Sequence, residues 1–173
     1  MLISLVGLPG SGKSTIGRQL ARRLQLPFHD SDQLIEQRLG CPIREFFERE
    51  GEESFRDIEE QAIDELTRQA GVLSTGGGAV LRPKTREHLR QRGRVIYLRS
   101  TPEELYRRLR HDTQRPLLQV TDPLQRLRDL YAARDPLYRE VGHFVVDTGR
   151  PSVPALVNKI LMQLELAGVL PSN

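Results

Sequence analysis

The chain alternates short apolar runs with longer segments in which apolar residues recur every three or four positions. The apolar runs predict buried strands at 2–6, 72–75, 95–98 and 144–146, with a short extended piece at 27–30. The periodic segments predict helices at 14–24, 31–39, 42–50, 52–69, 83–92, 102–110 and 123–134, and an apolar face on a terminal helix at 153–164. Strands interleaved with helices predict an α/β fold in which five parallel strands form one sheet flanked by helices.

Helix boundaries follow from residues with particular backbone preferences. Ser31 is predicted to cap the helix that Gly40 ends, because a hydroxyl accepts from the free amides of the first turn and glycine adopts the left-handed conformation after the last. The polar stretch 111–121 interrupts the helical pattern before the next helix begins. The sequence contains no internal repeat or linker, so residues 1–173 are predicted to form a single domain.

Composition and charge narrow the class of protein. Of the 173 residues, 38% are hydrophobic and 28% are charged, which is typical of a folded globular chain. The net charge is only +3, and arginines alternate with acidic residues, so a salt-bridged surface is favoured over a nucleic-acid-binding patch. No apolar run approaches the roughly 20 residues that span a bilayer. No signal peptide is expected, and the single cysteine, Cys41, excludes an internal disulfide, so we expect a cytoplasmic protein.

The strongest motif is a glycine-rich loop between the first strand and the first helix. Residues 7–14 match G-x-x-x-x-G-K-[ST], in which glycines allow successive backbone amides to point at a phosphate. Lys13 can neutralise the β- and γ-phosphate oxygens, and the Ser14 hydroxyl can ligate Mg²⁺. The flanking strand and helix make a chance match untenable, so the chain is predicted to bind a nucleoside triphosphate. GTPases, ATPase motors and small-molecule kinases all remain open at this point.

Two acids follow the second strand and narrow this choice. A motor or switch GTPase usually carries a strand that ends in aspartate, whereas 72–75 runs into the triple glycine 76–78. Asp30 and Asp32 lie instead at the carboxyl end of the short strand, which should face the same crevice as the phosphate loop. One can position Mg²⁺ and the other can accept a proton from an attacking hydroxyl. The alternative is a helix cap, supplied by Ser31 or Asp32.

Six motifs in register resemble those of the shikimate kinase family and together span nearly the whole chain. They are Gly7–Thr15, Asp30-Ser31-Asp32 with Glu36, Gly51-Glu52-x-x-Phe55-Arg56 with Glu59, Gly76-Gly77-Gly78, Arg115-Pro116-Leu117-Leu118 and Arg134-x-Pro136-x-Tyr138. The resemblance implies transfer of the γ-phosphoryl group of ATP to the 3-hydroxyl of shikimate, a step of chorismate and aromatic amino acid biosynthesis. It also implies a monomer whose partners are the two small-molecule substrates.

The resemblance assigns a role to each matching residue. The catalytic group is Lys13, Asp32 and Arg115, with Asp32 as base and Arg115 on a lid at about 111–121. ATP is expected to contact Gly10, Ser11, Gly12, Lys13, Ser14, Thr15, Arg108, Arg115 and Arg150, and Mg²⁺ to contact Ser14 and Asp30. Shikimate is expected to contact Asp32, Gly76, Gly77, Gly78, Arg56 and Arg134, within a helical substrate-binding region at about 31–68. Two arginines suit a planar carboxylate, and Glu59 is expected to orient Arg56.

Each of these arginines could also have a purely structural role. Arg56 could pair with Glu52 or Glu60 on its own helix, Arg134 with Asp129 or Asp135, and Arg108, Arg115 and Arg150 could be exposed surface residues. Cys41 is expected to pack rather than react. Two other functions remain open: a related kinase of the gluconate type, which should lack the arginine pair, and a binding module without catalysis, which should have lost Lys13, Asp32 or Arg115.

Overall fold

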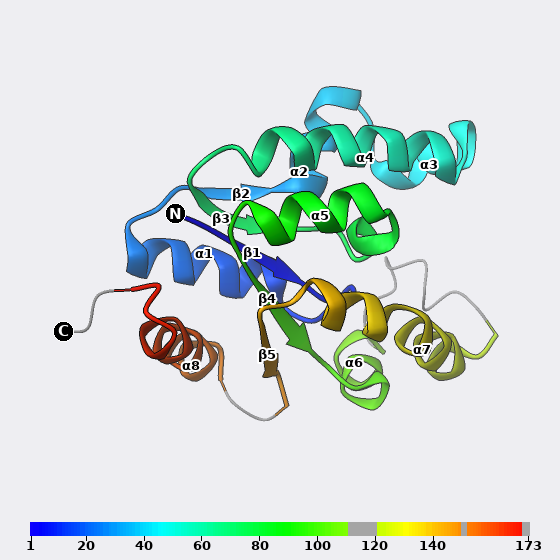
Figure 1. Ribbon diagram of the computed structural model, residues 1–173. Helices are drawn as coiled ribbons and strands as arrows, with labels where there is room; N and C mark the ends of the chain where they lie inside the picture. The colour runs from blue at the N-terminus through cyan, green and yellow to red at the C-terminus, as the bar shows by residue number, and fades with distance from the viewer. Residues whose placement is uncertain (111–120, 150–151, 171–173) are drawn as a thin grey trace.

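A computed structural model describes residues 1–110, 121–149 and 152–170. Five parallel strands form one sheet in the order β2-β3-β1-β4-β5 (Figure 1). The strands are β1 (Leu2–Val6), β2 (Phe28–Asp30), β3 (Gly71–Ser74), β4 (Arg94–Arg99) and β5 (Phe144–Asp147). The parallel α/β sheet predicted from the apolar runs is confirmed. Within the described parts, no helix is long and apolar enough to cross a membrane.

Helices cover both faces of this sheet (Figure 1). They are α1 (Lys13–Leu24), α2 (Ser31–Leu39), α3 (Ile43–Glu50), α4 (Glu52–Leu66), η1 (Ala79–Leu81, a 3₁₀ turn), α5 (Pro83–Gln91), α6 (Pro102–Leu109), α7 (Pro123–Val141) and α8 (Val153–Leu166). Alternate residues of each central strand face opposite layers. Ile3 and Leu5 pack with α1 and α8, whereas Leu2 and Val6 pack with α4, α5, α6 and α7. The predicted apolar face of the terminal helix is confirmed as the buried side of α8.

The helices α2, α3 and α4 form a group with a small core of their own, built on Ile35, Phe46 and Phe55. Cys41 is partly buried and packs against this core. Arg82, just before α5, fastens the group to the glycine segment, since its guanidinium pairs with Asp57 and Glu60 of α4. Arg82 therefore links α4 to the segment that follows the glycine triplet.

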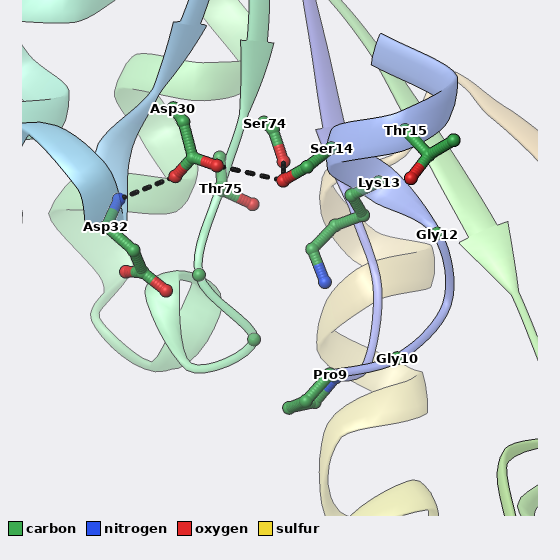
Figure 2. A pocket seen from close by; sticks show the side chains of 12 residues that line it. Pro9, Gly10, Gly12, Lys13, Ser14, Thr15, Asp30, Asp32, Ser74 and Thr75 are labelled. Atoms are coloured by element: carbon green, nitrogen blue, oxygen red, sulfur yellow. Dashed lines mark hydrogen bonds between the residues drawn. The ribbon is translucent and has the colours of Figure 1, made fainter. Parts of the chain in front are cut away.

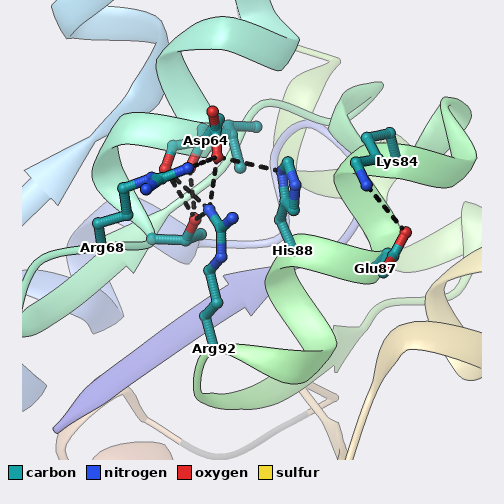
Figure 3. Close-up of polar contacts among 8 residues, drawn as sticks. Asp64, Arg68, Lys84, Glu87, His88 and Arg92 are labelled. Atoms are coloured by element: carbon teal, nitrogen blue, oxygen red, sulfur yellow. Dashed lines mark hydrogen bonds and ion pairs between the residues drawn. The ribbon is translucent and has the colours of Figure 1, made fainter.

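The carboxyl end of α4 is tied to the end of α5 (Figure 3). Arg92 Nη1 donates to the Asp64 carbonyl at 3.0 Å, to Asp64 Oδ1 at 2.6 Å and to Thr67 Oγ1 at 3.0 Å. Arg68 and His88 also reach the Asp64 carboxylate. Because a helix leaves its last carbonyl groups without partners, Arg92 both caps α4 and fixes its direction.

Three predicted helix boundaries are wrong. The helix predicted at 52–69 ends at Leu66. The cap of α2 is Asp30, whose Oδ1 accepts from the amides of Asp32 at 3.0 Å and Gln33 at 3.2 Å; the Ser31 hydroxyl accepts instead from the Gly76 amide at 3.2 Å. The helix predicted to end at 134 continues to Val141 through Pro136. A proline within a helix costs about 3 kcal/mol. Burial of Tyr138 and Val141 beyond it offsets that cost.

Candidate active site

The phosphate loop runs from β1 to α1 and is shaped by its glycines. Gly10 and Gly12 have φ angles of 86° and 93°, in the left-handed region that glycine adopts without strain. Lys13 is only 8% exposed, and its Nζ donates to the carbonyl oxygens of Gly7 at 2.7 Å and Leu8 at 3.0 Å. The loop therefore wraps around the ammonium group and presents the amino end of α1, where the helix dipole favours an anion.

A pocket of about 310 Å³ opens beside this loop (Figure 2). It is lined by Pro9, Gly10, Gly12, Lys13, Ser14, Thr15, Asp30, Asp32, Ser74, Thr75, Gly76 and Gly77. The loop, the ends of β2 and β3 and the first turn of α2 all contribute, because parallel strands end at one edge of the sheet. The structure thus brings together nine of the residues predicted for the site. Ser11, also predicted, lies buried within the loop itself.

Three oxygen-bearing side chains meet where a divalent cation would bind. The Ser14 hydroxyl donates to Asp30 Oδ2 at 2.8 Å and lies 3.2 Å from the Ser74 hydroxyl (Figure 2). Oxygen atoms are the ligands that Mg²⁺ prefers, and Mg²⁺ at nucleotide sites uses few protein ligands besides phosphates and waters. The residues therefore fit this ion. The sequence reasoning missed Ser74, because no local pattern states that its strand lies next to β1.

Asp32 is the partly buried carboxylate of the pocket. Burial, with the nearby charges of Glu59 and Asp30, raises its pKa from 3.8 to about 6, and the charge of Lys13 opposes the rise. A carboxylate with this pKa is a stronger base than an ordinary aspartate and is still ionised at neutral pH. It therefore has the proton affinity that a general base at this position needs.

This raised pKa predicts that Asp32 destabilises the protein at neutral pH. The folded state holds the proton up to about pH 6 and the unfolded state releases it near 3.8, so stability falls as the pH rises between these values. The cost is on the order of 3 kcal/mol above pH ~7. Asp32→Asn should therefore unfold at higher urea concentration than the wild-type chain above pH ~7 and at about the same concentration below pH ~3. An equal difference at both pH values would contradict the assignment of this pKa.

Arg56 of α4 is a largely buried cation beside the glycine segment. Its Nη1 lies 2.8 Å from Glu59 Oε1, and its Nη2 lies 3.5 Å from Glu52 Oε1. Its side chain is 12% exposed, and Glu59 is more deeply buried still. The expected contact by which Glu59 orients Arg56 is confirmed. Of the two alternative salt-bridge partners on α4, Glu52 does pair with Arg56, whereas Glu60 pairs with Arg82.

Arg134 reaches the same region from α7. Burial raises the pKa of Glu59, and the nearby charges of Arg56 and Arg134 oppose the rise. Among the described residues, neither of the two alternative salt-bridge partners pairs with Arg134. Asp135 binds Arg139 at 2.9 Å and the Tyr97 hydroxyl at 2.7 Å. Asp129 accepts a hydrogen bond from Gln125. The structure thus places two guanidinium groups around one buried carboxylate, close to the glycine segment.

Each glycine of the triplet makes room for a different part of the site. A Cβ on Gly76 would lie 2.5 Å from Asp32 Oδ1, and one on Gly77 would lie 2.6 Å from Cδ of Pro9 in the phosphate loop. A Cβ on Gly78 would overlap the Arg56 guanidinium. The three glycines therefore let the carboxylate, the phosphate loop and the arginine meet around one stretch of backbone.

Gly78→Ala is expected to impair substrate binding selectively. The new methyl group must displace the end of the flexible Arg56 side chain, which costs the fold little but moves the cation. We expect the KM for the anionic acceptor to rise by about 30-fold, the effect of about 2 kcal/mol, with little change in melting temperature. Steady-state kinetics and a thermal melt check both. An unchanged KM would contradict the expected role of Arg56 in binding the acceptor.

Of the three remaining arginines predicted for the site, the structure describes only Arg108. Arg108 lies at the end of α6 and donates to the Thr148 carbonyl at 3.0 Å and to the Gly10 carbonyl at 3.5 Å, so it joins the phosphate loop to the end of β5. Its predicted contact with ATP stays a prediction. Arg115, Arg150 and all of the predicted lid except Thr121 lie outside the described residues.

A parallel sheet with a phosphate loop after its central strand is the architecture of P-loop kinases, and this chain is an ATP-dependent kinase of that class. It belongs to the shikimate kinase family, whose sequence model matches residues 9–165.

Relatives and solved structures agree with this family over nearly the full chain. The shikimate kinase of Paracidovorax citrulli is 61% identical over 99% of this chain and 96% of its own length. That of Ralstonia nicotianae is 60% identical over 97% of this chain and 89% of its own. The structure of shikimate kinase from Acinetobacter baumannii in complex with shikimate has a TM-score of 0.91 and 48% identity, covering 98% of this chain and 94% of that one.

Proposed function

We propose that this chain phosphorylates the 3-hydroxyl of shikimate with ATP, giving shikimate 3-phosphate and ADP. The observation that carries the proposal is the convergence of Asp32, Arg56 and Arg134 on the glycine segment beside the phosphate loop. A guanidinium pair recognises a carboxylate, and a neighbouring carboxylate recognises hydroxyl groups. This set of groups matches an acid with several ring hydroxyls.

In the proposed reaction, Asp32 accepts the proton of the 3-hydroxyl as the oxygen attacks the γ-phosphorus atom. A bond forms between that oxygen and phosphorus, the bond to the bridging oxygen of ADP breaks, and ADP leaves with the electron pair. Arg56 and Arg134 hold the shikimate carboxylate, and Glu59 fixes Arg56 by their 2.8 Å contact. Holding the acceptor in line with the phosphate supplies much of the acceleration in such transfers.

On the ATP side, the loop amides and Lys13 take the phosphate groups. Lys13 would exchange its contacts with the Gly7 and Leu8 carbonyls for phosphate oxygens. Ser14 and Asp30 would hold Mg²⁺, which supplies charge neutralisation at the β- and γ-phosphates when it is bound. Arg108 and Arg150 would flank the adenine, and Arg115, on the proposed lid, would add positive charge at the transferring phosphoryl group.

Two properties complete the proposal. We assign a monomer, as the resemblance to the shikimate kinase family implies, and sedimentation at assay concentration tests it. We assign the cytoplasm, because the single Cys41 leaves no internal disulfide that would require an oxidising compartment.

The test is ADP release from Mg-ATP with shikimate, gluconate or nucleoside monophosphates as parallel acceptors. Stimulation by shikimate alone supports the proposal. Stimulation by gluconate or a nucleotide instead would keep the kinase class and overturn the role of Arg56 and Arg134. No stimulation, from protein that binds ATP, would point to a binding module.

A further inference from the structure

Tyr138 is a buried side chain to which the proposed reaction gives no part. It lies on α7, one turn after Arg134, and is wholly buried. Its hydroxyl donates to the carbonyl oxygen of Gly77 at 2.5 Å. Its ring packs against Tyr97 with centroids 5.0 Å apart. The hydroxyl is therefore held by a packed ring and joins α7 directly to the middle of the glycine segment.

Gly77 is in contact with the phosphate loop on another side. A Cβ on Gly77 would lie 2.6 Å from Cδ of Pro9 and 3.3 Å from its backbone nitrogen, so the close approach of the two residues requires glycine at this position. The neighbouring Gly76 and Gly78 lie against Asp32 and Arg56 in the same way. The Gly77 peptide thus lies where the substrate side and the ATP side of the pocket meet.

The Tyr138 hydroxyl keeps the proton that it donates to the Gly77 carbonyl. Burial raises the pKa of Tyr138 well above its usual value, although the positive charges of Arg134 and Arg56 oppose the rise. The phenol therefore stays protonated throughout the pH range in which a kinase is assayed. Among the described residues, the Gly77 carbonyl has no second side-chain donor, so the orientation of its peptide depends on Tyr138.

We propose that Tyr138 is a positioning residue that fixes the Gly77 peptide against the phosphate loop and so sets the distance between the acceptor and the transferring phosphate. This inference rests on the proposed function. The Tyr138 hydroxyl contacts the Gly77 carbonyl and lies beside Arg134 rather than beside the reacting atoms, so it acts through these groups and is not a catalytic residue. Small errors of placement in an active site reduce kcat strongly, by up to about 10²-fold for 1 Å.

The test is Tyr138→Phe in the full chain, with Tyr97→Phe as its matched control. Each variant loses one hydroxyl from the same buried ring pair, and Asp135 keeps Arg139 when the Tyr97 hydroxyl is gone. For Tyr138→Phe we expect kcat with shikimate to fall by about 10-fold, with the Kd for ATP unchanged, because only the placement of the two sides has changed. For Tyr97→Phe we expect kcat to stay near the wild-type value.

Both variants are assayed well below the melting temperature of the less stable one, so unfolded protein does not contribute. A wild-type kcat in Tyr138→Phe, or an equal loss of kcat in both variants, would overturn the positioning role. Failure of the proposed function is a separate result, because it is seen with the wild-type protein: shikimate then stimulates no ADP release at all.

Discussion

Asp32→Asn is expected to lower kcat by about 10³-fold while leaving the Kd for ATP unchanged, since a positioned general base contributes about 10²–10⁴-fold. The amide keeps the size of the carboxylate and the room that Gly76 provides, but it cannot accept the proton of the acceptor hydroxyl. Single-turnover kinetics with saturating shikimate and ATP measure the chemical step directly, and fluorescence titration with a nucleotide analogue measures binding.

The pH profile provides a second test of this role. Since the pKa of Asp32 is raised to about 6, kcat/KM should rise with pH through about 6 and level off above it. Glu48→Gln is a suitable control, because it makes the same chemical change on an exposed part of α3. It should keep the wild-type rate. Near-normal turnover by Asp32→Asn would refute its assignment as the base.

Lys13→Ala is expected to lower kcat/KM for ATP by about 10²–10³-fold, the usual effect of losing one preorganised charge at a transition state. Lys13 is buried at the centre of the phosphate loop, and no other lysine of the chain lies in the pocket. Its loss also removes the contacts to the Gly7 and Leu8 carbonyls, so the loop is expected to bind phosphate less tightly. Initial rates at several ATP concentrations separate kcat from KM.

The control for this prediction is Lys84→Ala. Lys84 is an exposed lysine of α5 that lies 3.5 Å from Glu87 (Figure 3). Surface pairs of this kind contribute little, so the variant should behave as wild type. If Lys13→Ala retained a kcat/KM of the same order as Lys84→Ala, the loop would not be the phosphate site.

Local patterns were sufficient for much of the fold. The apolar runs located all five strands. Within β1, Ile3 and Leu5 face one layer and Leu2 and Val6 face the other, because successive side chains of a strand point to opposite sides. The phosphate loop was also predictable, since its chemistry lies within eight consecutive residues. The order of the strands in the sheet was not predictable, because an apolar run carries no information about which other strand pairs with it.

The contacts that complete the site depend on residues far apart in the chain. Asp30 rather than Ser31 caps α2 because the Ser31 hydroxyl is engaged by Gly76, which only the folded sheet brings near. The helix α7 continues through Pro136 because the residues beyond it are buried in the core. The same continuation places Tyr138 against Gly77. Local conformational preferences of the residues are thus overridden where burial or a contact with a residue distant in the sequence stabilises the fold more strongly.

The most direct test of the central assignment is the identity of the product. Wild-type protein is incubated with Mg-ATP and shikimate, and the phosphorylated product is examined by phosphorus and proton NMR. We predict a single phosphate ester whose phosphorus couples to the proton on carbon 3 of the ring. Coupling to a different ring proton, or the release of inorganic phosphate without any ester, would contradict the proposed reaction.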